Sequence, residues 1–349
     1  MRLILAVGQQ VPVRLARSRP ISFHVTMIQF WRRVLAATWV LLAASLVIVA
    51  LPGQASAAGS VDRVGFFSKG LEMSGVHYSA AGDGPRPVLV MALGFGCTQD
   101  AILPEVAPRF TEAGFDVFTF DYRYFGASAG VPRNFIDIPS QLEDWRAAVD
   151  AAKNLPGVDR DRVGMWGTSF AGGHVLQIGS ENIPGVRAVI AQAPHVNGIA
   201  TVATIPVPIL AQLTALGTAD AAGSLIGQPP IYLPTAGEPG TVAMLPQPGA
   251  LDGYKRVVGA DFDNRTTART ALEVPFYSPD LVAALSNTPT FIATGDTDNI
   301  VSSPAARALA DRMGAEGRGY PGGHFDVYPG GVAYPQLILD QIAFLQNHL

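Results

Sequence analysis

The sequence predicts an α/β fold in which helices cover both faces of a mostly parallel central sheet. The first observation behind this prediction is an alternation of short apolar, β-branched runs with segments that carry apolar residues at helical spacing. The second is that the alternation is interrupted once, by a long stretch without a clear period between Pro194 and about Ser286. Together these observations predict one sheet domain that carries an insertion.

The early elements set the pattern for the rest of the domain. The run 87–93 (PVLVMAL) is continuously apolar, as expected for a strand that is buried on both faces of a sheet. A helix is expected over 104–113, ending at Gly114 as its C-cap glycine. The other expected elements are an edge hairpin at 64–67 and 76–78, strands at 116–122, 162–166, 186–193 and 289–294, and helices at 138–153, 170–178, 304–313 and 334–348.

The interrupted stretch predicts a lid or cap at 195–286 within a domain spanning 59–349. It is too long for a connecting loop in a compact domain. Ligands of parallel sheets bind outside the carboxyl ends of the strands, so a lid over that edge suits its position. The apolar segment 205–216 either lines a pocket for an acyl group or only packs the insertion against the sheet domain, and the sequence leaves both interpretations open.

The composition predicts a folded chain without a nucleic-acid partner. Of the 349 residues, 48% are hydrophobic and 15% are charged, which is typical of a chain that buries a large core. Six of the 24 basic residues precede Asp62, which leaves 18 against 28 acidic residues and a formal net charge of −10 for 59–349. That part of the chain has neither a basic stripe nor a lysine cluster, the features by which proteins bind nucleic acid.

Residues 1–58 are expected to be a presequence, with Met27 as the expected true start. Arg32 and Arg33 precede an apolar run at 34–51, and the segment Ala55-Ser56-Ala57 then matches an A-x-A cleavage signal. These are the parts of a secretory signal peptide, so we expect a secreted protein. The alternative is an uncleaved membrane anchor, since the apolar run is long for a signal peptide. In that case the N-terminal segment is the only expected membrane contact.

Neither a metal nor a cofactor is expected. Cys97 is the only cysteine, so an intramolecular disulfide and a cysteine-based zinc site are both excluded. The six histidines are scattered and do not have metal-ligand spacing. No loop has the glycine pattern that cradles the phosphates of a nucleotide.

The candidate nucleophile is Ser169, in the segment Gly167-Thr168-Ser169-Phe170-Ala171 between an expected strand and an expected helix. A serine that attacks a carbonyl must project from a very tight turn, and only small residues two positions either side allow it. Gly167 and Ala171 fill these positions. The helix N-terminus also favours developing negative charge near Ser169.

The candidate general base is His324, in a Gly-Gly-His loop between a short strand and the last helix. A serine hydroxyl needs such a base to become an effective nucleophile. His174 and His195 are the alternatives. His174 is expected to pack or cap in the helix that follows Ser169, and His195 to line the pocket.

The candidate acid that orients the base is Asp298, with Asp296 as the competitor. Both follow the strand at 289–294, and Asp298 occupies the acid position of a Gly-x-x-Asp turn. Asp296 lies nearer the strand and could cap the turn instead. The order Ser, Asp, His along the chain agrees with a strand-turn-helix serine hydrolase.

Two backbone amides are the candidate oxyanion donors, those of Phe170 and Phe95, with Gly96 as the alternate to Phe95. Phe170 begins the helix after Ser169. Phe95 and Gly96 lie in a glycine-containing loop after the strand at 87–93. Cys97, the next residue, is expected to be a small buried residue rather than a nucleophile.

With these residues in place, 60–349 resembles the α/β-hydrolase superfamily. The matching features are the glycine-containing loop at 93–98, the segment DYRYFGAS at 121–128, the turn at Ser169, the Gly-x-x-Asp turn and the Gly-Gly-His loop. This resemblance implies the α/β-hydrolase fold and a mechanism that uses Ser169, Asp298 and His324. Leu93 stands where many relatives carry His, which leaves the second oxyanion donor open.

Within the superfamily the chain is similar to dienelactone-hydrolase-like and serine-aminopeptidase-like proteins, which are close to X-Pro dipeptidyl-peptidase-type hydrolases. The segments 193–198 and 264–269 carry this likeness. The expected activity is hydrolysis of a small-molecule acyl ester. The alternatives are a peptidase acting on short peptides, and an acyltransferase or non-catalytic relative. A peptidase needs a carboxylate for the substrate's free amine, and the insertion offers Asp220, Glu238, Asp252, Asp261 and Asp263.

Overall fold

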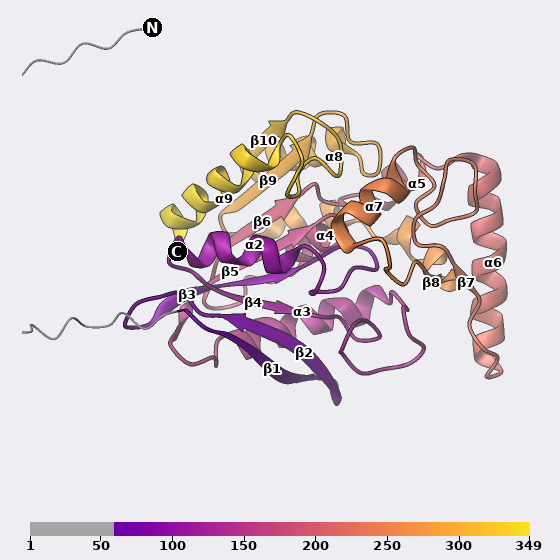
Figure 1. Cartoon of the computed structure of the whole chain (residues 1–349). Helices are drawn as coiled ribbons and strands as arrows, with labels where there is room; N and C mark the ends of the chain where they lie inside the picture. Colours follow the sequence, from indigo (N-terminus) through magenta and orange to yellow (C-terminus); the bar gives the residue numbers. More distant parts are fainter. Residues whose placement is uncertain (1–58) are drawn as a thin grey trace, which may run out of the picture. The chain divides into compact units, whose positions relative to one another are not determined.

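An eight-stranded sheet runs through residues 59–349, the part of the chain that the computed structural model describes (Figure 1). The expected presequence, for which the sequence predicts a signal peptide and a start at Met27, lies outside the described residues. The strand order is β1-β2-β4-β3-β5-β6-β9-β10. Both pairings of β2 are antiparallel and the others are parallel, so the predicted mostly parallel sheet is confirmed. The strands are β1 (Val61–Ser68), β2 (Leu71–Tyr78), β3 (Arg86–Ala92), β4 (Asp116–Phe120), β5 (Val158–Thr168), β6 (Val186–Gln192), β9 (Thr290–Gly295) and β10 (Glu316–Tyr320).

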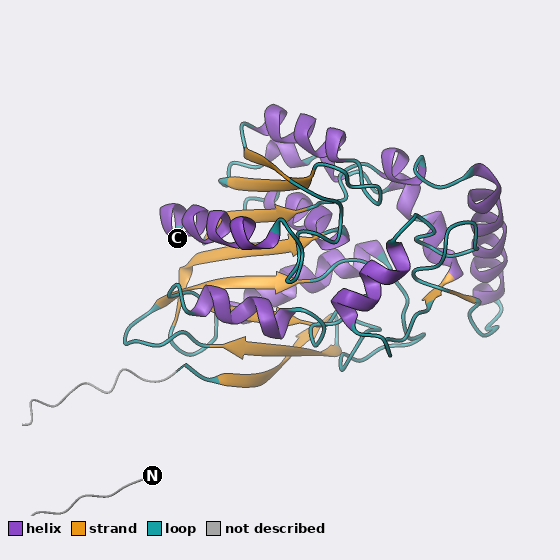
Figure 2. Cartoon of the chain, turned by 45° about the horizontal axis from the view of Figure 1, so that its top comes forward, coloured by secondary structure: helices purple, strands orange, loops and turns teal. Residues whose placement is uncertain are grey.

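Helices cover both faces of this sheet, as Figure 2 shows from a second direction. One hydrophobic core joins the sheet to α2 and α9, and a second core joins it to α3, α4 and α8. The predicted three-layer arrangement is therefore confirmed. The bounds are α2 (Leu103–Thr111), α3 (Ile138–Ala152), α4 (Phe170–Gly179), α8 (Ser303–Met313) and α9 (Tyr334–His348).

Strand β3 lies between these two cores, and this position explains why its part of the sequence is a continuous apolar run. Val88 and Val90 belong to the core with α3 and α4, whereas Leu89 and Met91 belong to the core with α2 and α9. All four side chains are fully buried. Because successive side chains of a strand point to opposite faces, a strand covered on both faces must be apolar throughout.

The end of α2 differs slightly from the prediction. The helix ends at Thr111 with Glu112 as its C-cap, so the expected C-cap at Gly114 is wrong by two residues. Gly114 has a φ of 95°, a left-handed conformation that glycine adopts without steric cost. It forms the turn that leads from the helix into β4.

The insert, which we define as the segment between β6 and β9, contains several short elements and one long helix. The sequence showed no clear period here, yet α6 (Val207–Leu225) has 19 residues. In Figure 1 this helix lies at the far edge of the insert. The other elements are α5 (Gly198–Val202), β7 (Tyr232–Leu233), α7 (Ala250–Val258), β8 (Thr266–Thr267), and the 3-10 turns η1 (Ala268–Leu272), η2 (Val274–Phe276), η3 (Pro279–Leu281) and η4 (Ala283–Leu285).

A buried ion pair fastens α6 to the rest of the insert. Asp220 accepts hydrogen bonds from Arg269 Nε at 2.8 Å and Arg269 Nη2 at 3.0 Å, and also from two backbone amides. Its side chain is fully buried. Burial alone would raise the pKa of Asp220, but these hydrogen bonds hold the pKa below its ordinary value. The carboxylate thus remains charged while holding the helix in place.

The segment 121–128 forms a compact turn after β4. Asp121 accepts hydrogen bonds from the amides of Gln99 at 2.8 Å and Ala127 at 3.0 Å. Gly126, with a φ of 50°, lies so close that a side chain there would collide with the Asp121 carboxylate. This turn therefore ties β4 to the loop after β3. Among residues 59–349, no helix is long and apolar enough to cross a bilayer.

Candidate active site

Ser169 lies at a sharp turn between β5 and α4. Its backbone has a φ of 57° and a ψ of −120°, outside the ordinary regions for a non-glycine residue. A side chain at Gly167 would collide with the carbonyl of Ala171, so only glycine allows strand and helix to approach this closely. The local sequence therefore fits the predicted tight turn.

The structure brings Ser169, His324 and Asp298 together from three different strand ends. The distance from His324 Nε2 to Ser169 Oγ is 3.0 Å, and from His324 Nδ1 to Asp298 Oδ2 it is 2.7 Å. The carboxylate of Asp298 is fully buried and the His324 side chain is 4% exposed. With the Nδ1 proton donated to Asp298, Nε2 is the nitrogen that accepts from the serine hydroxyl.

The backbone holds Asp298 in the orientation that this contact needs. Asp298 Oδ1 accepts hydrogen bonds from the amides of Ile300 at 2.9 Å and Val301 at 3.0 Å, which leaves Oδ2 directed at His324. Asp296, the competing carboxylate, is half exposed and pairs with Arg307 at 2.6 Å. It has no hydrogen bond to a histidine among the described residues.

His195 lies beside the site, but both of its ring nitrogens have protein partners. Nε2 is 2.9 Å from the carbonyl oxygen of Tyr277, so this nitrogen carries the proton, and Nδ1 accepts from Thr201 Oγ1 at 3.0 Å. Burial lowers the pKa of His195 to about 4, so the ring is neutral near pH 7. The ring lines the cavity next to Ser169, as the sequence predicts.

His174 is a buried packing residue inside α4. Its Nδ1 is 2.7 Å from the Tyr277 hydroxyl and its Nε2 is 2.9 Å from Gln141 Oε1. Burial, with a smaller contribution from His195, lowers the pKa of His174 to about 3. Both nitrogens are occupied, so this ring has no free acceptor for the Ser169 hydroxyl.

The loop after β3 packs directly against the turn at Ser169. A Cβ atom at Gly94 would lie 2.8 Å from Ser169 Cβ and 2.9 Å from the Phe170 amide nitrogen. The Phe170 amide begins α4 and has no partner within the helix. Among the described residues, the Phe95 amide also has no hydrogen-bond acceptor. Phe95 and Phe170 thus provide two unpaired amides close to Ser169, while the assignment of oxyanion donors stays a prediction.

Cys97 is only partly buried, which corrects the expectation of a buried residue. Burial of its thiol group nevertheless raises the pKa of Cys97 to about 12. A thiol must lose its proton to act as a nucleophile, so Cys97 is unreactive near pH 7.

A buried hydrogen-bond network supports the two loops that carry Ser169 and His324. Thr168 Oγ1 and the hydroxyl of Tyr328, four residues after His324, are 2.8 Å apart. Gln192 donates to Thr168 Oγ1 at 3.3 Å and accepts from Gln341 of α9 at 2.9 Å. This network, which no sequence pattern indicates, limits independent motion of the two loops.

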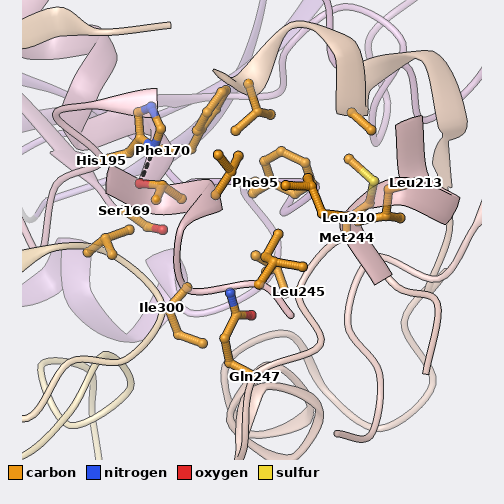
Figure 3. Close-up of a pocket in the computed structure, with 16 residues that line it drawn as sticks. Phe95, Ser169, Phe170, His195, Leu210, Leu213, Met244, Leu245, Gln247 and Ile300 are labelled. Atoms are coloured by element: carbon orange, nitrogen blue, oxygen red, sulfur yellow. Dashed lines mark hydrogen bonds between the residues drawn. The ribbon is translucent and has the colours of Figure 1, made fainter. Parts of the chain in front are cut away.

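Ser169 opens onto a cavity beneath the insert, which we call the lid chamber (Figure 3). The space between its lining residues, including its opening to solvent, is about 620 Å³, with Ser169 at one end and Leu213 and Met244 at the other. Ile205, Leu210 and Leu213, all from the apolar segment 205–216, contribute to its wall. The other apolar lining residues are Phe95, Phe170, Val202, Met244, Leu245, Ala271, Val274, Ile300 and Val301.

The lid chamber has few polar side chains besides Ser169. These are His195, Thr201 and Gln247, and no carboxylate lines the chamber among the described residues. Gln247 Nε2 donates to Thr204 Oγ1 at 2.8 Å, while its Oε1 has no partner there. None of the five carboxylates considered for a peptidase, Asp220, Glu238, Asp252, Asp261 and Asp263, lines the chamber.

Sequence reasoning missed most of the chamber's far wall. Met244, Leu245 and Gln247 lie in an irregular segment that precedes α7. Ile300 and Val301 lie two and three residues after Asp298, in a turn where the sequence pattern indicates only the carboxylates. Across residues 59–349, no group of three or more metal-ligating side chains comes together.

Comparison with known proteins places this site in a family. Residues 83–331 match the family described as serine aminopeptidase, S33. The quorum-quenching protein AidA of Acinetobacter baumannii is 36% identical over 288 residues, which cover 81% of this chain and 94% of AidA. The polyketide transferase grgF of a Penicillium species is 33% identical over 243 residues, or 69% of this chain and 79% of grgF. The crystal structure of the Penicillium α/β hydrolase GrgF superposes with a TM-score of 0.71 at 28% identity, covering 83% of this chain and 99% of that one.

Proposed function

The chain belongs to the serine aminopeptidase S33 family of the α/β-hydrolase superfamily, and we propose that it hydrolyses carboxylic esters through an acyl intermediate on Ser169. The observation that carries this proposal is the hydrogen-bonded series Asp298–His324–Ser169, which ends at an apolar chamber. A serine beside a base can attack a carbonyl, and an apolar chamber can hold the acyl chain of an ester.

In the proposed mechanism, Ser169 Oγ forms a bond to the ester carbonyl carbon while its proton passes to His324 Nε2. The carbonyl oxygen becomes negatively charged and is stabilised by the amides of Phe95 and Phe170. The bond to the alcohol oxygen then breaks, and His324 donates the proton to that oxygen. Water repeats the sequence with the acyl-serine and releases the carboxylic acid. Asp298 stabilises the positive charge on His324 during both halves of the reaction.

The character of the lid chamber favours an ester over an aminopeptidase substrate. A free α-amino group is positively charged at neutral pH and needs a carboxylate partner when it is taken out of water. Asp220 is occupied by Arg269, and Asp263 pairs with Arg265. Neither carboxylate reaches the lid chamber.

Acyl transfer is the second candidate function, because grgF, a relative at 33% identity, is called a polyketide transferase. The chemistry up to the acyl-serine is the same for hydrolysis and transfer. The two functions differ only in whether water or another nucleophile attacks that intermediate. The acceptor side of the site therefore decides between them.

Labelling with a fluorophosphonate probe tests the nucleophile. We expect rapid labelling of the unsubstituted protein and none of Ser169→Ala, whose far-ultraviolet circular dichroism should be unchanged. Equal labelling of the two proteins contradicts the assignment of Ser169.

A substrate panel tests the reaction class. We expect turnover of p-nitrophenyl esters, with kcat/KM rising from acetate to medium-chain acyl groups because each methylene buried in the chamber contributes up to about 0.8 kcal/mol. Aminoacyl-naphthylamides serve as the matched peptidase substrates. Turnover of the amides alone contradicts an esterase.

We further propose that the enzyme is exported, on the basis of the signal-peptide pattern at 27–58. Expression of the full chain with a C-terminal tag tests this proposal. Export predicts a product whose N-terminus follows Ala57, recovered outside the cytoplasm. An intact N-terminus on membrane-bound protein identifies the uncleaved anchor instead.

A further inference from the structure

Ser169 lies between two cavities. One is the lid chamber, of about 620 Å³. The other, which we call the histidine-side chamber, is smaller, with about 290 Å³ of space including its opening to solvent, and has His324, Tyr254, Cys97 and Tyr328 in its wall. Ser169 and Phe95 line both cavities, whereas His324 lines only the second. The two sides of the nucleophile therefore differ in size and in access to the base.

This difference matters because the leaving alcohol and the attacking nucleophile must both exchange a proton with His324, whereas the acyl chain need not contact it. His324 Nε2 must reach the oxygen of the departing alcohol in order to donate its proton. The nucleophile that later attacks the acyl-serine must give up a proton to the same nitrogen. Both the alcohol and the acceptor thus have to occupy the side of Ser169 that His324 lines. The acyl chain extends from the carbonyl carbon in the other direction.

We propose that the histidine-side chamber is the leaving-group and acceptor site, and that the lid chamber is the acyl site. This inference rests on the proposed acyl-serine function and assigns each cavity one half of the substrate. The substrate class is an ester with a medium-length apolar acyl group and a small alcohol. Because the same small chamber receives the acceptor, water and short alcohols enter it while bulky acceptors do not. The enzyme is accordingly a hydrolase rather than a transferase to large acceptors.

The packing of α7 against the loop that carries His324 limits the size of the histidine-side chamber. A side chain at Gly253 would collide with the ring of Phe325, so α7 packs directly on the loop that carries His324. Tyr254, the next residue, is 5% exposed, and its ring contacts Phe262 and Phe325 at centroid distances of 5.5 and 6.1 Å. The chamber cannot widen unless α7 or this loop moves.

Cys97 and Tyr254 form the partition between this chamber and the outside. Both residues line the histidine-side chamber, and the Tyr254 ring packs on that of Phe262, which lines the surface groove outside it. Cys97 also lines a surface groove of about 950 Å³ bounded by the exposed Asp263 and Arg265. Removing the Tyr254 ring should therefore join the chamber to the groove and admit larger alcohols and acceptors.

The test uses two ester series, measured by acid release in a pH-stat. One series varies the acyl group from acetate to decanoate with ethanol as the alcohol. The other keeps hexanoate and varies the alcohol from methanol to benzyl alcohol. Tyr254→Ala enlarges the histidine-side chamber, and Leu213→Trp fills the far end of the lid chamber. Cys97→Phe is the converse of the first variant, because it fills the histidine-side chamber.

We expect Tyr254→Ala to raise kcat/KM for benzyl hexanoate relative to methyl hexanoate by at least roughly tenfold, a typical effect of pocket size. Its dependence on acyl length should match the unsubstituted enzyme. Leu213→Trp should lower kcat/KM for decanoate relative to acetate by a similar factor and leave the alcohol dependence unchanged. Cys97→Phe should lower kcat/KM for benzyl hexanoate relative to methyl hexanoate.

Acyl transfer provides a second readout that needs no comparison of absolute rates. With benzyl alcohol added to ethyl hexanoate, Tyr254→Ala should form several times more benzyl ester per hexanoic acid than the unsubstituted enzyme. In the opposite result, Tyr254→Ala alters the acyl preference and Leu213→Trp alters the alcohol preference. That result overturns the assignment of the two chambers but not the proposed function. If the unsubstituted enzyme neither hydrolyses any ester nor reacts with a fluorophosphonate, the proposed function itself fails.

Discussion

The sheet body and the insert contribute different parts of the site. The body, which is the sheet with its five covering helices, carries Ser169, Asp298 and His324 at the ends of β5, β9 and β10. The insert supplies Leu213, Met244 and most of the other walls around them. Regular strands hold the reacting atoms within hydrogen-bond distance, whereas short helices and turns shape the space for the substrate.

The comparison indicates that chemistry and substrate selection are physically separable in this chain. Substitutions in the body that touch the hydrogen-bonded series should abolish turnover with every substrate. Those in the insert should change stability or substrate preference while Ser169 stays reactive.

The largest effect is expected in the body, at the acid that orients His324. Asp298→Asn should lower kcat by roughly 10³- to 10⁴-fold, because an amide cannot stabilise the charged imidazole or hold its tautomer. Asp296→Asn is the matched control, two residues away, and its exposed pair with Arg307 predicts a change within about threefold. Steady-state kinetics on one ester measures both. The reverse ranking would mean that Asp296 is the functional acid.

The body was also the part that the sequence predicted well. Strand β3 is a continuous apolar run because it is buried on both faces, and the tight turn at Ser169 requires small residues, which can be recognised in the sequence. Asp298 could be preferred over Asp296 from the turn pattern alone. Phe95 could be singled out only as one of two loop amides, since the direction of an amide depends on backbone angles that the sequence does not specify.

The sequence predicted that the insert exists but not which helices and strands it contains. Helix α6 shows no clear apolar period because its exposed face is also uncharged, with Val207 77% and Leu225 87% exposed. Its one charged residue, Asp220, faces inward to Arg269. The walls formed by Met244 and Gln247 depend on contacts between distant segments, which no local pattern encodes. Tertiary packing therefore decides the structure here.

The insert should lose stability when its buried ion pair is broken. Asp220→Asn leaves the Arg269 guanidinium without a charged partner in a buried setting, which typically costs about 3–5 kcal/mol. Asp263→Asn is the control, since its pair with Arg265 is more than half exposed and should contribute within about 0.5 kcal/mol. Urea denaturation gives both values.

Fluorophosphonate labelling of the Asp220→Asn variant tests whether the body stays reactive when the insert is destabilised. Ser169 should remain reactive under native conditions, because Asp220 lies in the insert and the hydrogen-bonded series lies in the body. Preference for longer acyl chains should decrease, since α6 contributes Leu210 and Leu213 to the lid chamber. Loss of labelling in a folded variant would show that the two regions are not separable.

The smallest effect is expected where the insert meets the body, at Glu273. Its carboxylate accepts a hydrogen bond from the Ile138 amide at the start of α3 at 3.0 Å. Burial raises the pKa of Glu273 to about 7 from its ordinary 4.5, and nearby Asp137 adds to the shift. The folded chain therefore binds more protons than the unfolded chain between these values, so stability decreases as the pH rises from about 4.5 to 7 and is level above that.

Glu273→Gln keeps the hydrogen-bond acceptor and removes the charge, so it should remove this pH dependence. We expect its Tm to match the unsubstituted protein at pH 4.5 and to exceed it at pH 8 by about one or two degrees, a small shift because the group is only partly buried. Differential scanning calorimetry across this range measures the difference. A Tm that is lower at pH 8 would mean that the charged carboxylate stabilises the junction, and that the insert and the body are held together there by an ionic contact.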